Sequence, residues 1–219
     1  MKPYYMILDV ETNGFLTKTN GASIHSGRVL QIAWALYTAG GKKLSEYNHY
    51  INQRNYEVKN TEIHGITKET INIKGFDFLT VMKKLYHDMK TVKAIVGHHI
   101  FFDESVLVNE INIYGVTKYL DVFHHVAWIC TQKLACKLYG KQLQKLEKTY
   151  LEVIGKPMEN AHNALYDVLG LGEIVTYWLT HKIITKAFQP YPKGGINAYL
   201  TQRNKTNNTK DTEDTVIIQ

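Results

Sequence analysis

Two acidic residues stand one residue apart near the start of the chain, at the end of an apolar run. The run is MILDVETNG, and the acids are Asp9 and Glu11. In a β-strand, residues two apart point to the same face. Two carboxylates on one face repel each other unless a cation lies between them. Taken alone, the pair is more typical of a solvated strand end that precedes a turn.

Two later stretches carry further candidate groups. In IVGHHIFFDESVL, Asp103 follows a short apolar run and stands at the start of an expected helix, where an acid is favoured by capping and by the helix dipole. In NAHNALYDVLG, His162 precedes Asp167 by five residues. Asp167 lies among apolar residues of a helical pattern, and a buried acid is costly without a partner. Each stretch alone has an ordinary structural explanation.

Four acids and one histidine taken together suggest metal-assisted hydrolysis. Carboxylate oxygens select hard ions such as Mg²⁺ or Mn²⁺. Two such ions about 3.5–4 Å apart can activate a water and stabilise the leaving oxygen of a phosphoryl transfer. A histidine with an ordinary pKa of about 6.5 is suited to take the proton from that water.

The elements that must position these groups follow from the hydrophobic pattern. Residues 4–10, 28–37 and 44–51 are expected to form an antiparallel meander, with a glycine turn at 39–41. Two short strands are expected at 94–97 and 126–130. Helical spacing of apolar residues predicts helices over 76–89, 102–113, 131–139, 143–154 and 163–179. This order favours a mixed α/β sandwich, and no G-x-G-x-x-G or Walker A motif is present. The three tryptophans are expected in the core.

Length and composition fit an ordinary globular chain. The 219 residues suit one domain at 1–185 and a C-terminal extension at 186–219, flexible from about 201. Apolar content is 44%, and neither an 18-residue apolar run nor a signal peptide is evident, so no membrane partner is expected. Two cysteines favour an intracellular location, cytoplasmic or nucleoid-associated. The net charge of +6 is compatible with nucleic acid but does not require it.

Three motifs in order resemble those of a known family. DVETNG, GHHIFFD and AHNALYD look like the three motifs of the DEDDh (DnaQ-like) 3′–5′ exonucleases. The His-x₄-Asp spacing of the last motif marks the subfamily with a histidine base. RVLQIAW, EIHGIT and KLEKTYLEVIG are also similar to family segments, so the resemblance covers about residues 4–181.

The resemblance implies a fold and a set of roles. The fold would be ribonuclease H-like, with a mixed five-stranded sheet and helices on both faces. Asp9, Glu11 and Asp167 would bind the ion that carries the attacking water, and Asp9 with Asp103 would hold a second ion. The cofactors would be two divalent metal ions, Mg²⁺ or Mn²⁺. His162 would be the general base.

Substrate contacts are implied less directly. Thr12 would contact the terminal nucleotide and His64 would lie near it. Phe15 could stack on the terminal base, although a structural role is also open. The loop at 15–27 either borders the substrate groove or is a disordered insertion. His99 stands where the family expects asparagine, which puts the local hydrogen bonding in doubt.

The function that follows is metal-dependent hydrolysis at 3′ ends, which releases nucleoside 5′-monophosphates. DNA is favoured over RNA as substrate. The expected partners are single-stranded nucleic acid or 3′ ends, and a DNA polymerase if the chain proofreads; the oligomeric state is left open. The alternatives are a 3′–5′ exoribonuclease acting on short RNA and a non-catalytic nucleic-acid-binding member of the fold. A ribonuclease H-type endonuclease is a third, and it would lack the His-x₄-Asp motif.

Overall fold

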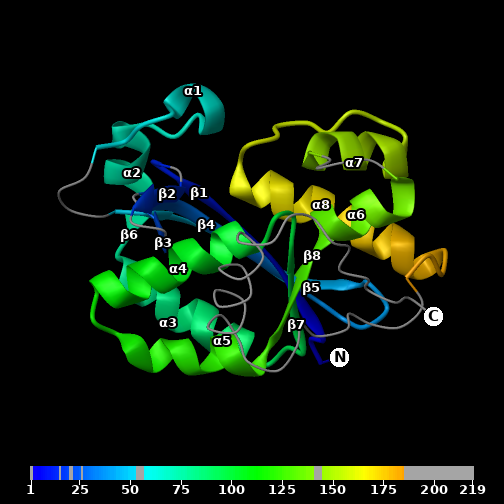
Figure 1. The fold of residues 1–219 in the computed structure, drawn as a ribbon, viewed down its shortest axis with the longest axis horizontal. Coiled ribbons are helices and arrows are strands. Elements are labelled where there is room, and N and C mark those ends of the chain that lie inside the picture. The colour runs from blue at the N-terminus through cyan, green and yellow to red at the C-terminus, as the bar shows by residue number, and fades with distance from the viewer. Residues whose placement is uncertain are drawn as a thin grey trace.

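The computed structural model describes residues 2–14, 16–19, 22–25, 27–52, 57–140 and 145–184. Its strands are β1 (Tyr5–Thr12), β2 (Leu16–Thr19), β3 (Ala22–His25), β4 (Val29–Tyr37), β5 (Lys43–Ile51), β6 (Gly75–Phe76), β7 (Ala94–Gly97) and β8 (Ala127–Cys130). Six of them form one mixed sheet in the order β6-β5-β4-β1-β7-β8, and β2 pairs with β3 in a separate hairpin. The first strand of the chain is therefore central in the sheet (Figure 1).

The sheet combines an antiparallel meander with parallel strands. β1 pairs antiparallel with β4, and β4 pairs antiparallel with β5, as the sequence predicts. β7 lies parallel to β1 on its other side, and β8 lies parallel to β7. β4 is β-branched and aromatic in composition and is buried along its whole length, which suits an interior strand. β5 alternates between exposed and partly buried residues, so one of its faces meets solvent.

Helices cover both faces of the sheet (Figure 1). They are α1 (Thr61–His64), α2 (Lys68–Lys74), α3 (Phe78–Met89), α4 (Phe101–Ile113), η1 (Thr117–Leu120), α5 (Asp121–His125), α6 (Thr131–Tyr139), α7 (Leu146–Ile154) and α8 (Ala164–Thr180). α3, α4 and α5 pack on the face that contains Met6 and Leu8 of β1. α6, α7 and α8 pack on the face that contains Tyr5 and Ile7. Alternate residues of β1 thus enter two separate cores.

Several expected features are confirmed and a few are wrong. The mixed α/β architecture is observed, and Trp34, Trp128 and Trp178 lie in the core. The main sheet has six strands rather than five, because two residues of β6 pair with the end of β5. The predicted loop before β4 contains the β2–β3 hairpin, which has too few apolar residues to show alternation. The short helices α1, α2, η1 and α5 were not predicted, since tertiary contacts decide such short elements.

Other expectations lie outside the described residues. They are the C-terminal extension from residue 186 onward, including the tail from about 201, and the start of the helix predicted from residue 143. Among the described residues, no helix is both long and apolar enough to cross a membrane.

A buried ion pair joins α4 to the sheet. The Glu110 carboxylate accepts hydrogen bonds from Arg28 Nε at 2.7 Å and from its terminal nitrogen at 2.9 Å, and a third from the Val29 backbone N–H at 3.0 Å. Glu110 is fully buried. Removing one partner of such a pair leaves a buried charge uncompensated, so the contact fixes α4 against the start of β4.

Candidate active site at the end of the central strand

The acids of the first motif lie where β1 ends. Asp9 and Glu11 continue the series of Tyr5 and Ile7, whose side chains point to the face of the sheet that α8 covers. The two carboxylates therefore lie on that face as well. One carboxylate oxygen from each of Asp9, Glu11 and Asp167 falls in a group whose members all lie within 4.8 Å of one another. The structure therefore brings the first and third motifs together, as the sequence predicts.

Asp167 is delivered by the first turn of α8. The Asn163 side chain caps this helix by accepting the Leu165 N–H at 3.2 Å, and the Asp167 N–H bonds to the Asn163 carbonyl at 2.9 Å. Asp167 Oδ1 is buried and has no hydrogen-bond partner among the described residues. A buried carboxylate oxygen without a partner is unfavourable, and a cation held with Asp9 and Glu11 would satisfy it.

Asp103 approaches the same strand from α4, in the other helical layer. It is 3% exposed, and its Oδ1 accepts the Val10 backbone N–H at 2.9 Å. β7 pairs with β1 only as far as Ile7, so this carboxylate takes the place of a strand partner further along. A Cβ at Gly97 would lie 2.9 Å from the Leu8 carbonyl oxygen, so glycine lets the end of β7 lie close to β1. Asp103 is outside the group of three oxygens within 4.8 Å.

The four carboxyl groups share one electrostatic environment. Burial, followed by the charges of Asp103, Asp167 and Glu11, raises the pKa of Asp9 well above its ordinary value. Burial and neighbouring carboxylates also raise the pKa values of the other acids, to about 8 for Glu11, about 8 for Asp103 and about 7 for Asp167. A cluster that holds protons this strongly lacks compensating positive charge. Its oxygen-only donor set fits a hard divalent cation.

His162 lies at the edge of this cluster, immediately before the cap of α8. Its backbone has a φ of 66°, and its side chain is 48% exposed. His162 Nε2 lies 3.3 Å from Glu147 Oε1 in the first turn of α7. Glu147 also contributes to the raised pKa of Asp167. The sequence does not single out Glu147, because an acid in the first turn of a helix is ordinary and only the packing of α7 against α8 brings it near His162.

Thr12 and His64, the expected substrate contacts, both use their side chains in hydrogen bonds within the protein. The Thr12 hydroxyl donates to the Gly14 carbonyl at 2.7 Å. His64 is buried, its Nδ1 accepts the Ile66 N–H at 3.0 Å, and its Nε2 donates to the Lys59 carbonyl at 2.8 Å. Both ring nitrogens of His64 are therefore used in hydrogen bonds to the backbone of Lys59 and Ile66. A nucleotide would contact the segment that His64 holds in place, and not the ring nitrogens themselves.

Two further predicted features have different outcomes. Phe15 and the side chains of residues 15–26 lie outside the described residues. His99 has a φ of 68°, in the left-handed region that asparagine adopts more readily than most residues. Its ring stacks on Phe102 with 6.4 Å between the ring centroids. The backbone conformation is one physical reason for asparagine at this position, and His99 adopts it as well.

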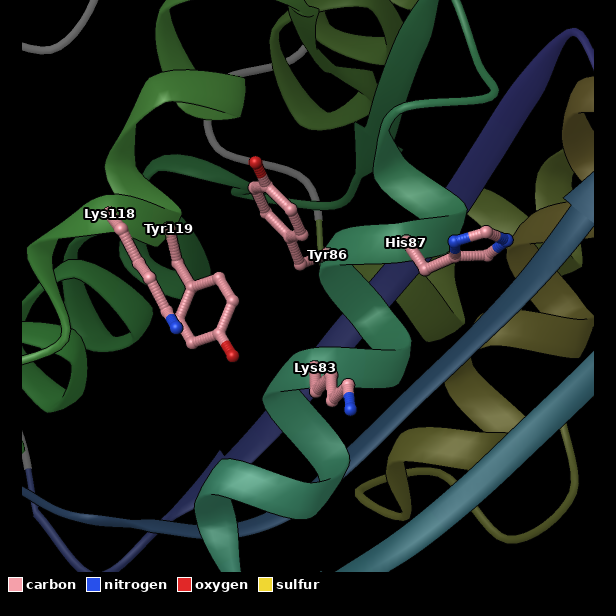
Figure 2. A pocket seen from close by; sticks show the side chains of 5 residues that line it. All are labelled: Lys83, Tyr86, His87, Lys118 and Tyr119. Atoms are coloured by element: carbon pink, nitrogen blue, oxygen red, sulfur yellow. The ribbon is translucent and has the colours of Figure 1, made fainter.

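A hollow on the surface of the described residues lies away from the acids. It measures about 380 Å³ and lies between α3 and η1, where it is lined by Lys83, Tyr86, His87, Lys118 and Tyr119 (Figure 2). In the figure, His87 points away from Lys118 and Tyr119, so these side chains do not converge on one centre. The chemistry is therefore assigned to the carboxylate cluster and not to this hollow.

A mixed sheet of this order, with helices on both faces and carboxylates clustered at the end of its central strand, is a ribonuclease H-like fold. The chain belongs to the exonuclease family, whose RNase T model matches residues 6–175. A comparison with curated proteins found no match.

Solved structures share this fold at low sequence identity. The nuclease domain of 3′hExo, a DEDDh family member bound to rAMP, is 16% identical with a TM-score of 0.69; the match covers 87% of this chain and 98% of that one. Escherichia coli exonuclease I with a dT13 oligonucleotide is 18% identical with a TM-score of 0.65, covering 82% of this chain and 41% of that one. Exonuclease X with 5′ overhanging duplex DNA is 20% identical with a TM-score of 0.57, covering 81% and 93%. The chain thus spans less than half the length of exonuclease I.

Proposed function

We propose that the chain hydrolyses the terminal phosphodiester bond at 3′ ends of nucleic acid and releases nucleoside 5′-monophosphates, with DNA favoured over RNA. The observation that carries this proposal is the convergence of Asp9, Glu11 and Asp167, with a buried and unpartnered oxygen on Asp167. Asp103 completes the set from the opposite helical layer. Membership of the exonuclease family supports the same chemistry.

The residues present fit two divalent ions, Mg²⁺ or Mn²⁺. Asp9, Glu11 and Asp167 would hold one, and Asp9 with Asp103 would hold the other. Bound ions of this kind lower the pKa of a water and offset the charge that develops on the phosphate. The carboxylates must lose their protons before they bind a cation, so occupancy of the site depends on pH.

His162 would act as the general base by taking a proton on a ring nitrogen. Its half-exposed position lets a water reach the ring. Glu147 Oε1, 3.3 Å from Nε2, would stabilise the imidazolium that forms, as a carboxylate does for a catalytic histidine in other hydrolases. Thr12 and the loop held by His64 would contact the terminal nucleotide, and Phe15 is retained as a candidate stacking residue.

The similar structures support both DNA and RNA as the substrate polymer. Structures similar to this chain include one with a dT13 oligonucleotide, one with duplex DNA and one with rAMP. We therefore keep a 3′–5′ exoribonuclease acting on short RNA as the second candidate. A DNA polymerase partner would follow only if the chain proofreads. A non-catalytic nucleic-acid-binding role is less consistent with an acid cluster that destabilises the fold when no cation is bound.

The experiment is digestion of matched single-stranded and double-stranded DNA and RNA, labelled at the 5′ end, with Mg²⁺ or Mn²⁺ present. The expected result is a ladder that shortens from the 3′ end, with nucleoside 5′-monophosphates as products and faster cleavage of DNA. Asp9→Asn and His162→Ala should each lose at least about 100-fold in rate, since each removes a group used in the reaction. Intact oligonucleotides with both metals would refute the proposal.

Matched controls separate the site from the surface. His181→Ala removes an exposed histidine at the end of α8, and Glu57→Gln removes an acid whose side chain is 78% exposed. Both should keep the rate of the unaltered protein. Cleavage of a circular substrate would point instead to an endonuclease.

A further inference from the structure

Gln31 is a fully buried polar residue in a strand whose other residues are all apolar or aromatic. It is the third residue of β4. A buried amide gives up its hydrogen bonds to water on folding, and this costs free energy unless protein groups replace them. The partners of Gln31 therefore indicate what the residue does.

Two of its contacts reach the first residues of α8. Gln31 Oε1 accepts the Ala164 backbone N–H at 3.3 Å, and Gln31 Nε2 donates to Asn163 Oδ1 at 3.3 Å. Asn163 Oδ1 is the same atom that caps the helix by accepting the Leu165 N–H. One side chain of the sheet thus holds both the cap residue of α8 and the residue after it.

A third contact fixes which way the amide points. Gln31 Nε2 also donates to Asn48 Oδ1 on β5 at 2.8 Å, which leaves Oε1 directed at the Ala164 N–H. On the other side of β4, Gln31 stands directly opposite Glu11 in the β1–β4 register. Directly opposed residues of antiparallel strands have Cβ atoms about 4.5–5.5 Å apart. Gln31 therefore lies between a carboxylate of the cluster and the start of the helix that carries Asp167.

We propose that Gln31 is a positioning residue, which sets the first turn of α8 against β1 and so places Asp167 and His162 relative to Glu11. The Asp167 N–H bonds to the Asn163 carbonyl, so a displacement of Asn163 moves Asp167 with it. The inference rests on the proposed function for its catalytic readout only. Its metal-binding readout depends on the carboxylate cluster alone.

The test is Gln31→Met, in which an unbranched side chain of similar length fills the space without the hydrogen bonds. The Mn²⁺ concentration that gives half of the maximal rise in thermal midpoint should increase about 10–100-fold, as for other groups that orient metal ligands. With saturating Mn²⁺ and a 5′-labelled oligonucleotide, kcat should fall about tenfold. KM should stay within about threefold, because the described hydrogen bonds of the Gln31 side chain go to Asn48, Asn163 and Ala164, none of which is assigned to the substrate.

Val175→Ala is the matched control for destabilisation. Val175 is fully buried in the same core, in the later half of α8 and away from its cap. This variant should lower the thermal midpoint and leave the half-saturating Mn²⁺ concentration unchanged. An equal loss of Mn²⁺ affinity in both variants would assign the effect to stability and overturn the inference.

A second variant keeps the test decisive if Gln31→Met does not fold. Asn163→Ala removes the acceptor of the Gln31 amide and should raise the half-saturating Mn²⁺ concentration similarly, whereas Asn163→Asp keeps the acceptor and should not. The Gln31→Met and Asn163→Ala double variant should lose less Mn²⁺ affinity than the sum of the two single losses, since the Gln31–Asn163 hydrogen bond is common to both. Additive losses, or an unchanged Mn²⁺ midpoint in Gln31→Met, would overturn the role. If the unaltered protein binds Mn²⁺ but hydrolyses no oligonucleotide, the proposed function fails and the Mn²⁺ midpoints still decide the role of Gln31.

Discussion

Replacing Asp103 by asparagine should stabilise the metal-free protein at alkaline pH while abolishing activity. Burial, with a smaller contribution from Asp167, raises the pKa of Asp103 from 3.8 to about 8. The asparagine side chain would keep the oxygen that accepts the Val10 N–H at 2.9 Å, so the contact with β1 is retained. The substitution therefore removes the ionised state and little else.

The sign follows from where the proton is bound. Between about pH 4 and pH 8 the folded protein keeps the proton of Asp103 and the unfolded chain has lost it, so stability falls as the pH rises through this range. The difference between 3.8 and about 8 corresponds to roughly 6 kcal/mol above pH 8, at about 1.36 kcal/mol for each pKa unit. Because neighbouring acids of the cluster can retain protons in its place, we expect about half of this, roughly 3 kcal/mol, to be recovered.

The assay is thermal unfolding in the presence of a chelator at pH 5 and pH 9. For a chain of this size, 1 kcal/mol shifts the thermal midpoint by about 2–4 °C. Asp103→Asn should therefore raise the midpoint by about 6–12 °C at pH 9 and by less than about 3 °C at pH 5. Glu57→Gln, at an exposed position, should change neither value. A decrease of the thermal midpoint at pH 9, or the same increase at both pH values, would refute the inference that ionised Asp103 destabilises the metal-free protein.

Three further outcomes test other parts of the structure. Glu110→Ala should lower the free energy of unfolding by about 3–5 kcal/mol in urea titration, because it removes the acceptor of three hydrogen bonds and leaves the Arg28 guanidinium without its buried carboxylate; a loss under 1 kcal/mol would contradict this. Gly172→Ala should lower the thermal midpoint by an amount equal to about 1–3 kcal/mol, since its Cβ would lie 2.0 Å from the buried Tyr37 hydroxyl; an unchanged midpoint would show that Tyr37 can move aside. Added Mn²⁺ should raise the thermal midpoint of the unaltered protein more at pH 9 than at pH 6, since the acids must be deprotonated to bind it; a shift independent of pH would contradict the raised pKa values.

The acids could be predicted from the sequence because their positions follow from local geometry. Strand alternation alone puts Asp9 and Glu11 on one face, and the apolar stripe of α8 fixes which residues of that helix face the sheet. Asp103 and Asp167 could be assigned to the same site only with the help of the family resemblance. No local sequence pattern predicts which strand end lies beside which helix start.

The remaining features of the site depend on tertiary packing. Glu147 comes near His162 only because α7 packs against α8, and neither helix carries a signal for that register. The sequence places Gln31 in a strand but predicts no role for it. A polar residue among apolar ones is visible in the sequence, whereas its hydrogen-bond partners are not. The two-residue β6 forms because it meets the end of β5, which no property of a Gly-Phe pair predicts.

The polar contacts outside the acid cluster explain how a fold can hold four carboxyl groups together. Burial and neighbouring carboxylates raise the pKa values of Asp9 and Glu11, so the metal-free cluster opposes folding whenever these acids ionise. The elements that carry these acids are fixed elsewhere, α8 by Gln31 and α4 by the Arg28–Glu110 pair. These contacts involve none of the four acids, so they persist whether or not a cation is bound. The cluster is thereby kept assembled before the metal arrives, and a cation that enters it gains the full electrostatic benefit without first having to bring the two helices together.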